Sequence, residues 1–205
     1  METKDDCITM GIENTAFIRD VTAYDTVDAA YWHAYQGGSV AFDVDVSDVG
    51  CGCAAGVYLT ALDQETCSWG ARADDAMPTC QSIDLMEANA KGFMTASHPM
   101  GNAGDSHCTQ KAEDYDYWAY GPNSMYTIDT SKSFTVQTRF FSALDEDGWF
   151  YESLKQIETV LSQGDKEVSL VQDCEFTTTL GESLNGWMAM GISVYDAGLD
   201  NEISP

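Results

Sequence analysis

The stretch from residue 80 to residue 89 carries the side chains best suited to acid and base chemistry. It consists of Cys80-Gln81-Ser82-Ile83-Asp84-Leu85-Met86-Glu87-Ala88-Asn89. The carboxylic acids of Asp84 and Glu87 could pass protons to and from a bound molecule. Ser82, two positions before Asp84, adds a hydroxyl, which is a poor nucleophile at neutral pH without an activating base. These three side chains can act together only if they share one face of an element.

Alternation predicts that this element is a β-strand. Ile83 and Leu85 alternate with Ser82 and Asp84, so a strand would bury the apolar pair and leave the polar pair on the open face. Glu87 breaks this alternation by one position. It joins the open face only if a β-bulge near Met86 re-aims it, and bulges are common beside active sites.

The order Asp84-x-x-Glu87-Ala88-Asn89, followed by His98-Pro99, resembles the catalytic strand of glycoside hydrolase family 7. This family comprises the fungal-type cellobiohydrolases and endoglucanases, and its pattern is Glu-x-Asp-x-x-Glu. The resemblance makes Glu87 the general acid/base, Asp84 the carboxylate that tunes the nucleophile, and His98 a cleft residue near the point of cleavage. Ser82 stands where the family has its nucleophilic glutamate.

The resemblance covers roughly residues 36 to 197, with its pieces in the family's order and approximate spacing. It implies substrate-binding roles for Tyr58, Tyr195, Trp118 and Trp149, although the two tryptophans could instead lie in the core or at the rim. The matching pieces are Phe42 to Ser47, Cys51-Gly52, Val57-Tyr58-Leu59, Tyr120-Gly121-Pro122, Thr127 to Thr130, Phe134-Thr135-Val136 and Met188 to Asp196.

A serine at the nucleophile position predicts that hydrolysis is impaired or lost. Retaining glycosidases need a second carboxylate about 5–5.5 Å from the acid to attack the sugar. His98 is a weak candidate as a base for Ser82, because the resemblance places it in the cleft beside Asp84. An inverting reaction with Asp84 as the base is also disfavoured, since Asp84 is expected beside Ser82 rather than beyond the substrate.

Other positions also depart from the family. Met86 replaces a tryptophan, Ala54 a cleft asparagine, and Met100 a cysteine after His-Pro. Long family segments have no counterpart, so the loops that would roof a tunnel are missing and an open groove is expected. The serine could reflect natural loss or a deliberate Glu-to-Ser substitution, and the divergent neighbours favour natural loss.

Composition narrows the function classes. The 34 acidic and 9 basic side chains give a formal net charge of −25, which argues against nucleic acid and anionic membranes as partners. No apolar stretch is long enough to span a bilayer. The first residues lack the apolar segment of a signal peptide, so we expect that any such signal has been removed or never existed.

Seven cysteines without a C-x-x-C pair favour disulfides and an oxidising, extracellular location. The family resemblance implies two bridges, Cys67 with Cys80 and Cys108 with Cys174. Cys51 matches a family cysteine whose usual partner lies beyond the end of this sequence, so a pairing with Cys7 is suggested instead, which would leave Cys53 odd, either free or linked to another molecule.

Strand signals dominate the rest of the chain. We expect strands over 39–46, 57–62, 92–95, 125–128 and 133–141, with a hairpin connection at Asp145 to Gly148. Leu154, Ile157 and Leu161 have the spacing of a short helix within 152–162. The 205 residues are expected to form one antiparallel β-sandwich domain (1–205), which the resemblance refines to an all-β, concanavalin-like jelly roll with an open groove on its concave sheet.

Two functions of different classes follow. The first is recognition of β-1,4-glucan on a retaining hydrolase scaffold, with turnover impaired by Ser82 and no cofactor or metal required. The second is a non-catalytic glucan-binding or cell-surface structural protein, since folds of this kind also serve lectins. A cleft that binds no sugar and instead serves protein interaction is a third, weaker hypothesis.

Overall fold

A computed structural model places most of the strand-forming parts of the chain. The residues it describes are 2–4, 7–9, 14–17, 31–32, 37–61, 81–98, 108–144, 151–174, 180–181, 184 and 188–196. Within them, no helix is long and apolar enough to cross a membrane.

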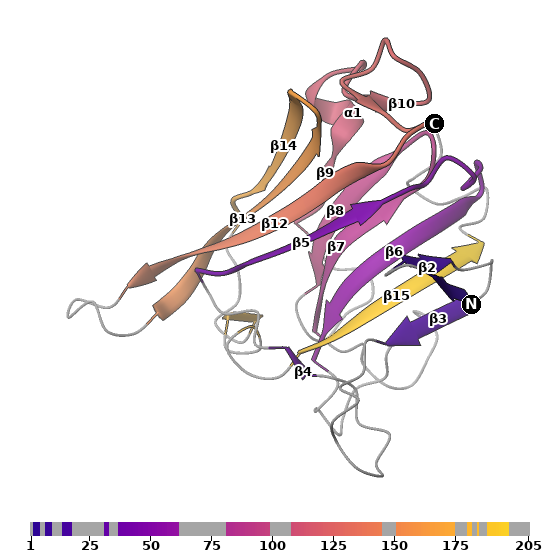
Figure 1. The fold of residues 1–205 in the computed structure, drawn as a ribbon. Helices are drawn as coiled ribbons and strands as arrows, with labels where there is room; N and C mark the ends of the chain where they lie inside the picture. The colour runs from indigo at the N-terminus through magenta and orange to yellow at the C-terminus, as the bar shows by residue number, and fades with distance from the viewer. Residues whose placement is uncertain are drawn as a thin grey trace.

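Two antiparallel sheets lie one over the other (Figure 1). The larger has seven strands in the order β3-β15-β6-β7-β8-β9, and β4 also pairs with β15. Its strands are β3 (Asn14–Phe17), β4 (Tyr31–Trp32), β6 (Cys53–Thr60), β7 (Ser82–Ala88), β8 (Phe93–His98), β9 (Gln110–Lys111) and β15 (Met188–Asp196). The smaller sheet has the order β14-β13-β12-β5, formed by β5 (Ser39–Val44), β12 (Phe134–Leu144), β13 (Tyr151–Gln163) and β14 (Lys166–Gln172).

The remaining described elements are short. β1 (Glu2–Lys4) pairs with β2 (Cys7–Thr9), and β10 (Tyr120–Gly121) pairs in parallel with β11 (Ile128–Asp129). The α-helix α1 spans four residues, Ala112–Tyr115. The predicted all-β class and antiparallel sandwich are therefore confirmed.

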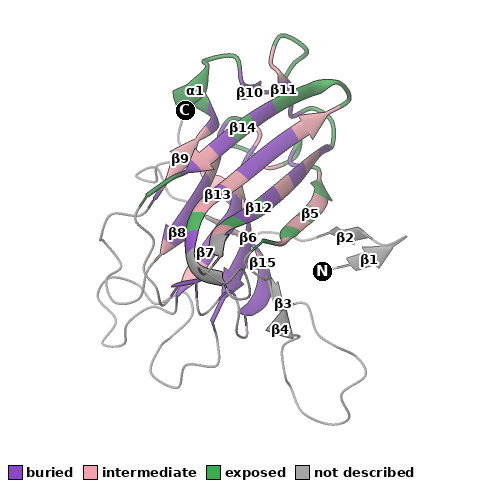
Figure 2. Ribbon diagram, turned by 90° about the vertical axis from the view of Figure 1, so that its left-hand side faces the viewer, coloured by how far each residue is buried: buried purple, intermediate pink, exposed green. Residues whose placement is uncertain are grey.

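The core lies between the two sheets and is built by alternation along the strands. Figure 2 shows buried positions alternating with more exposed ones along β12 and β14. Leu59 and Ile83 from the larger sheet and Phe140, Ile157 and Leu170 from the smaller one are each no more than 1% exposed. Each such side chain contributes roughly 1.5–3 kcal/mol through burial.

The expected helix within 152–162 is wrong, because this segment belongs to β13. Its pairing with β12 matches Phe141 to Gln156 and Ser142 to Leu154, so Lys155 is an extra residue on β13. This bulge turns Leu154 onto the same inner face as Ile157. Leu154 and Ile157 are therefore three positions apart although both lie in a strand, and this spacing resembles that of a helix. The β-branched residues Ile157, Thr159 and Val160 favour the strand.

The other boundaries agree in outline with the expectations. The hairpin connection expected at Asp145 to Gly148 lies outside the described residues, and the strands on either side of it, β12 and β13, pair antiparallel. The strand expected over 125–128 starts only at Ile128. Asn123 forms a turn before it, accepting from the backbone N–H of Met125 through its side chain and from that of Tyr126 through its carbonyl.

Candidate functional site

A β-bulge in β7 gives the acidic strand its shape. On the β8 side Asp84 pairs with Ala96 and Glu87 with Met94, so two residues of β7 stand opposite one residue of β8. On the β6 side the pairing also skips Leu85. Leu85 and Met86 are both buried in the core. The bulge near Met86 that Glu87 needs in order to join the open face is therefore present, and it puts Asp84 and Glu87 on the same face.

That face is the outer one of the larger sheet. Thr95 and Ser97 of β8 point inward, because their hydroxyls contact Thr159 and Gln172 of the smaller sheet. Their alternating neighbour His98 therefore points outward, and it stands opposite Ser82 on β7. Ser82, Asp84 and Glu87 share the outer face.

Asp84 and His98 form a close pair on this face. His98 Nε2 lies 2.5 Å from Asp84 Oδ2, and the side chain of Asp84 is 7% exposed. Burial disfavours a charged imidazole, but the hydrogen bond and negative charge of Asp84, together with the charge of Glu87, outweigh it and raise the pKa of His98. The imidazolium of His98 is thus more populated than that of an isolated histidine.

Glu87 is held by two phenols. Its Oε1 accepts a hydrogen bond from Tyr195 Oη at 2.5 Å and another from Tyr58 Oη at 3.3 Å. Ser193 Oγ in turn donates to Tyr58 Oη at 3.4 Å. Burial raises the pKa values of Tyr58 and Tyr195, as does the charge of Glu87, so both phenols stay protonated and can donate.

Two effects raise the pKa of Glu87 to about 7. Burial is the larger, and the negative charge of Asp84 adds to it, while the two phenol donors and the charge of His98 act in the opposite direction. A carboxyl group with this pKa can both donate and accept a proton near neutral pH. Among the outward positions of β6, β7, β8 and β15 that the structure describes, Asp84 is the other carboxylate.

Some contributors were not predicted. Ser193 contacts Tyr58, and Met94 packs against Ala54. Gly56 lies opposite Glu87, and a Cβ there would collide with the phenol of Tyr58. A glycine inside a strand is a signal of close approach that could have identified this position.

The structure does not connect Trp118 to Glu87. Its ring is 44% exposed between α1 and β10 and packs against Tyr117 and Tyr126. Trp149 lies outside the described residues. The substrate-binding roles of both tryptophans stay predictions.

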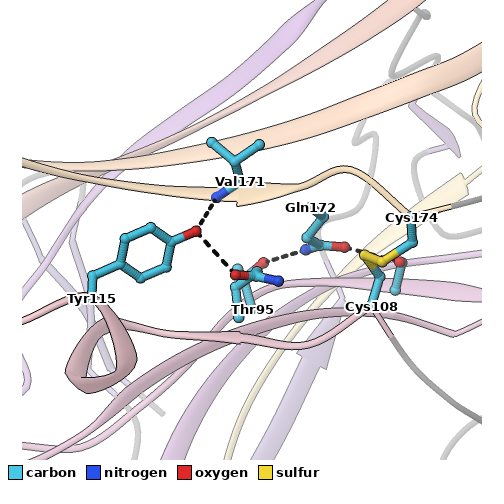
Figure 3. Close-up of a disulfide and its surroundings, with 8 residues drawn as sticks. Thr95, Cys108, Tyr115, Val171, Gln172 and Cys174 are labelled. Carbon is cyan, nitrogen blue, oxygen red and sulfur yellow. Dashed lines mark hydrogen bonds between the residues drawn. A yellow bond between two sulfur atoms is a disulfide. The ribbon is translucent and has the colours of Figure 1, made fainter.

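The cysteines are settled in part. The bridge between Cys108 and Cys174 is confirmed (Figure 3). Cys51 and Cys53 are free thiols, so the suggested pairing of Cys51 with Cys7 is wrong; Cys51 lies exposed in the turn before β6. Cys67 and Cys80 lie outside the described residues.

Comparison with known proteins shows what the chain is similar to in sequence and in fold. No family model matches it. A probable endo-β-1,4-glucanase of Neosartorya fischeri is 28% identical over 200 residues, covering 73% of this chain and 47% of that protein. A family 7 cellobiohydrolase from Daphnia pulex superposes with a TM-score of 0.63 at 16% identity, covering 80% of this chain and 58% of that one. The chain has the fold of glycoside hydrolase family 7.

A second solved structure supports this fold. The native endocellulase of Humicola insolens superposes with a TM-score of 0.68 at 18% identity, covering 93% of this chain and 65% of that one. This agreement confirms the jelly-roll sandwich predicted from the resemblance. The chain spans about half the length of the curated relative from Neosartorya fischeri.

Proposed function

We propose that this chain binds β-1,4-glucan across the outer face of its larger sheet and has impaired or lost hydrolysis. The main observation in favour of this proposal is that Glu87, with a pKa of about 7, shares this face with Asp84, while Ser82 has a hydroxyl where a carboxylate would be needed. Glu87 is suited to the proton transfers of glycoside cleavage. Ser82 lacks the carboxylate that would attack the sugar.

The substrate class comes from the relatives. The curated protein of Neosartorya fischeri is named a probable endo-β-1,4-glucanase. An uncharged polysaccharide also suits a chain with a net charge of −25, which repels anionic polymers. The Cys108–Cys174 disulfide favours an oxidising compartment, so we place the protein outside the cell.

The decisive experiment restores the missing carboxylate. The parent, Ser82→Glu and the double variant Ser82→Glu/Glu87→Gln are incubated with cellohexaose, and the products are followed by mass spectrometry. We expect Ser82→Glu to cleave at least about 100-fold faster than the parent and the double variant to lose this gain. Ser124→Glu, which adds the same charge at an exposed turn, is the matched control and should leave cleavage unchanged.

Calorimetry with cellohexaose tests binding separately. We expect the parent to bind with a Kd below about 1 mM. The second candidate function is a non-catalytic glucan-binding or cell-surface protein, and the serine at position 82 favours it. This second function is supported if the parent binds but Ser82→Glu stays inactive. The proposal fails if neither protein binds or cleaves any soluble β-glucan.

A further inference from the structure

Glu87 receives two hydrogen bonds at the same carboxylate oxygen. Tyr195 of β15 and Tyr58 of β6 both donate to Oε1, over 2.5 Å and 3.3 Å. No hydrogen bond from the described residues reaches Oε2. The three side chains come from three neighbouring strands, since β15 pairs with β6 and β6 pairs with β7.

The backbone of β6 is built to allow this convergence. A Cβ on Gly56 would lie 1.7 Å from Tyr58 Oη and 2.1 Å from Cζ of the same ring. The phenol of Tyr58 therefore lies directly over Gly56, which is itself the strand partner of Glu87. Any other residue at position 56 would push the hydroxyl of Tyr58 away from its place beside Glu87.

The same contacts argue against a role in stacking on sugar rings. Tyr58 is 9% exposed, so little of its ring remains available to a ligand. Its hydroxyl is anchored further, because Ser193 Oγ donates to it. Tyr195 packs against Ala54 while its hydroxyl is directed to Glu87.

We propose that Tyr58 and Tyr195 are positioning residues that clamp Oε1 of Glu87 and leave Oε2 as the oxygen presented to the glycosidic oxygen of a bound glucan. The identity of the ligand rests on the proposed function, whereas the clamp rests on the contacts alone. The clamp also restrains the carboxyl group from rotating. Because the phenols donate, they favour the ionised form of Glu87 and oppose the effect of burial.

Four titratable groups surround Glu87. Tyr58 approaches from β6, Tyr195 from β15 and Asp84 from β7 itself, while His98 of β8 is bound to Asp84. Asp84 raises the pKa of Glu87, and the other three lower it through hydrogen bonds or positive charge. Removing one phenol hydroxyl should therefore raise the pKa of Glu87 and leave the contributions of Asp84 and His98 in place.

The test is a titration of the Glu87 carboxyl carbon by NMR, in the parent and in Tyr195→Phe, Tyr58→Phe and the double variant. A hydrogen bond to a charged group is worth about one pKa unit, so each single variant should raise the pKa of Glu87 by about one unit and the double variant by more. Tyr117→Phe, which removes a hydroxyl from a ring that is 73% exposed, is the matched control and should cause no shift.

Phenylalanine keeps the ring and removes only the hydroxyl, so comparing Tyr195→Phe with Tyr195→Leu, which removes the ring as well, separates positioning from sugar stacking. If the pKa of Glu87 is unchanged in both single variants while affinity for cellohexaose falls only in Tyr195→Leu, the residues stack on sugar and the proposal is overturned. Gly56→Ala should reproduce the shift of Tyr58→Phe by displacing the phenol. The titration needs no sugar, so a shifted pKa in a chain that binds no glucan would sink the proposed function and support the clamp.

Discussion

At the scale of single residues, the raised pKa of Glu87 makes the stability of the fold depend on pH. Its pKa is raised from 4.5 to about 7, first by burial and then by the charge of Asp84. Between these two values the folded chain keeps a proton that the unfolded chain has released. The free energy of unfolding therefore falls as the pH rises from about 4.5 to 7 and stays lower above that range.

Glu87→Gln should remove this dependence, because an amide does not titrate. We expect the variant to match the parent at pH 4 and to be about 1 to 3 kcal/mol more stable at pH 8. Urea unfolding at the two pH values measures the difference. An equal change in the free energy of unfolding at both pH values would mean that the charge of Glu87 does not destabilise the fold.

Asp84→Asn should lower the pKa of His98. The side chain of Asp84 supplies both the hydrogen bond and the largest charge that raise this pKa, so removing its charge should lower the pKa of His98. The stabilisation that His98 provides is complete below its unfolded pKa near 6.5 and disappears as the pH rises through the folded value. NMR titration of the imidazole protons measures the shift.

The control for this titration is Asp48→Asn, an exposed acid in the turn after β5. It should leave the pKa of His98 where it is. A comparable fall in both variants would attribute the effect to the overall negative charge rather than to the contact with Asp84.

At the scale of elements, a buried polar network joins β8 to the smaller sheet (Figure 3). Gln172 of β14 is fully buried, donates to Thr95 Oγ1 at 3.1 Å and accepts from Ser97 Oγ at 2.9 Å. Thr95 also donates to the backbone carbonyl of Asp84. The network thus contacts β7, the strand that carries Asp84 and Glu87, from the inner side of the larger sheet.

Gln172→Leu should destabilise the protein by about 2 kcal/mol. The change leaves the hydroxyl of Ser97 buried without an acceptor, and such a group costs about 1–3 kcal/mol. Denaturant unfolding measures the loss. Gln137→Leu, whose amide bonds Arg139 at an exposed site, should cost much less, and equal losses would contradict the role of the network.

The element scale also shows why one secondary-structure prediction succeeded and another failed. Both β7 and β13 contain one extra residue, Leu85 and Lys155 respectively. In β7 the residue that breaks the alternation is Glu87, which belongs to the recognisable pattern Asp84-x-x-Glu87, and this pattern suggested a bulge. In β13 the displaced residue Leu154 is an ordinary core leucine, so the irregular spacing imitated a helix.

At the scale of the whole molecule, the Cys108–Cys174 disulfide closes a long loop. The two cysteines are 66 positions apart and connect the segment before β9 to the end of β14. By the chain-entropy argument, closing a loop of this length stabilises the fold by up to about 4 kcal/mol. The bridge adjoins Gln172, so it ties the two sheets at the same edge as the polar network (Figure 3).

Replacing both cysteines by serine should therefore lower the Tm and cost about 2–4 kcal/mol. Differential scanning calorimetry measures the change, with Cys51→Ser as the control because that thiol is free and exposed. If the reduced parent melts at the same temperature as the oxidised parent, the bridge does not stabilise the fold.

The sequence by itself determined the class of fold, the strand that carries the acids and the bulge within it. These features follow from alternation and local spacing, which are properties of neighbouring residues in the chain. The tertiary structure alone decided what each acid touches. Glu87 meets Tyr58 and Tyr195 across 29 and 108 positions of sequence, and the pairing of β15 with β6 and of β6 with β7 is what brings these side chains together. The pKa of Glu87 depends on burial and on these distant neighbours, so it is a property of the folded molecule.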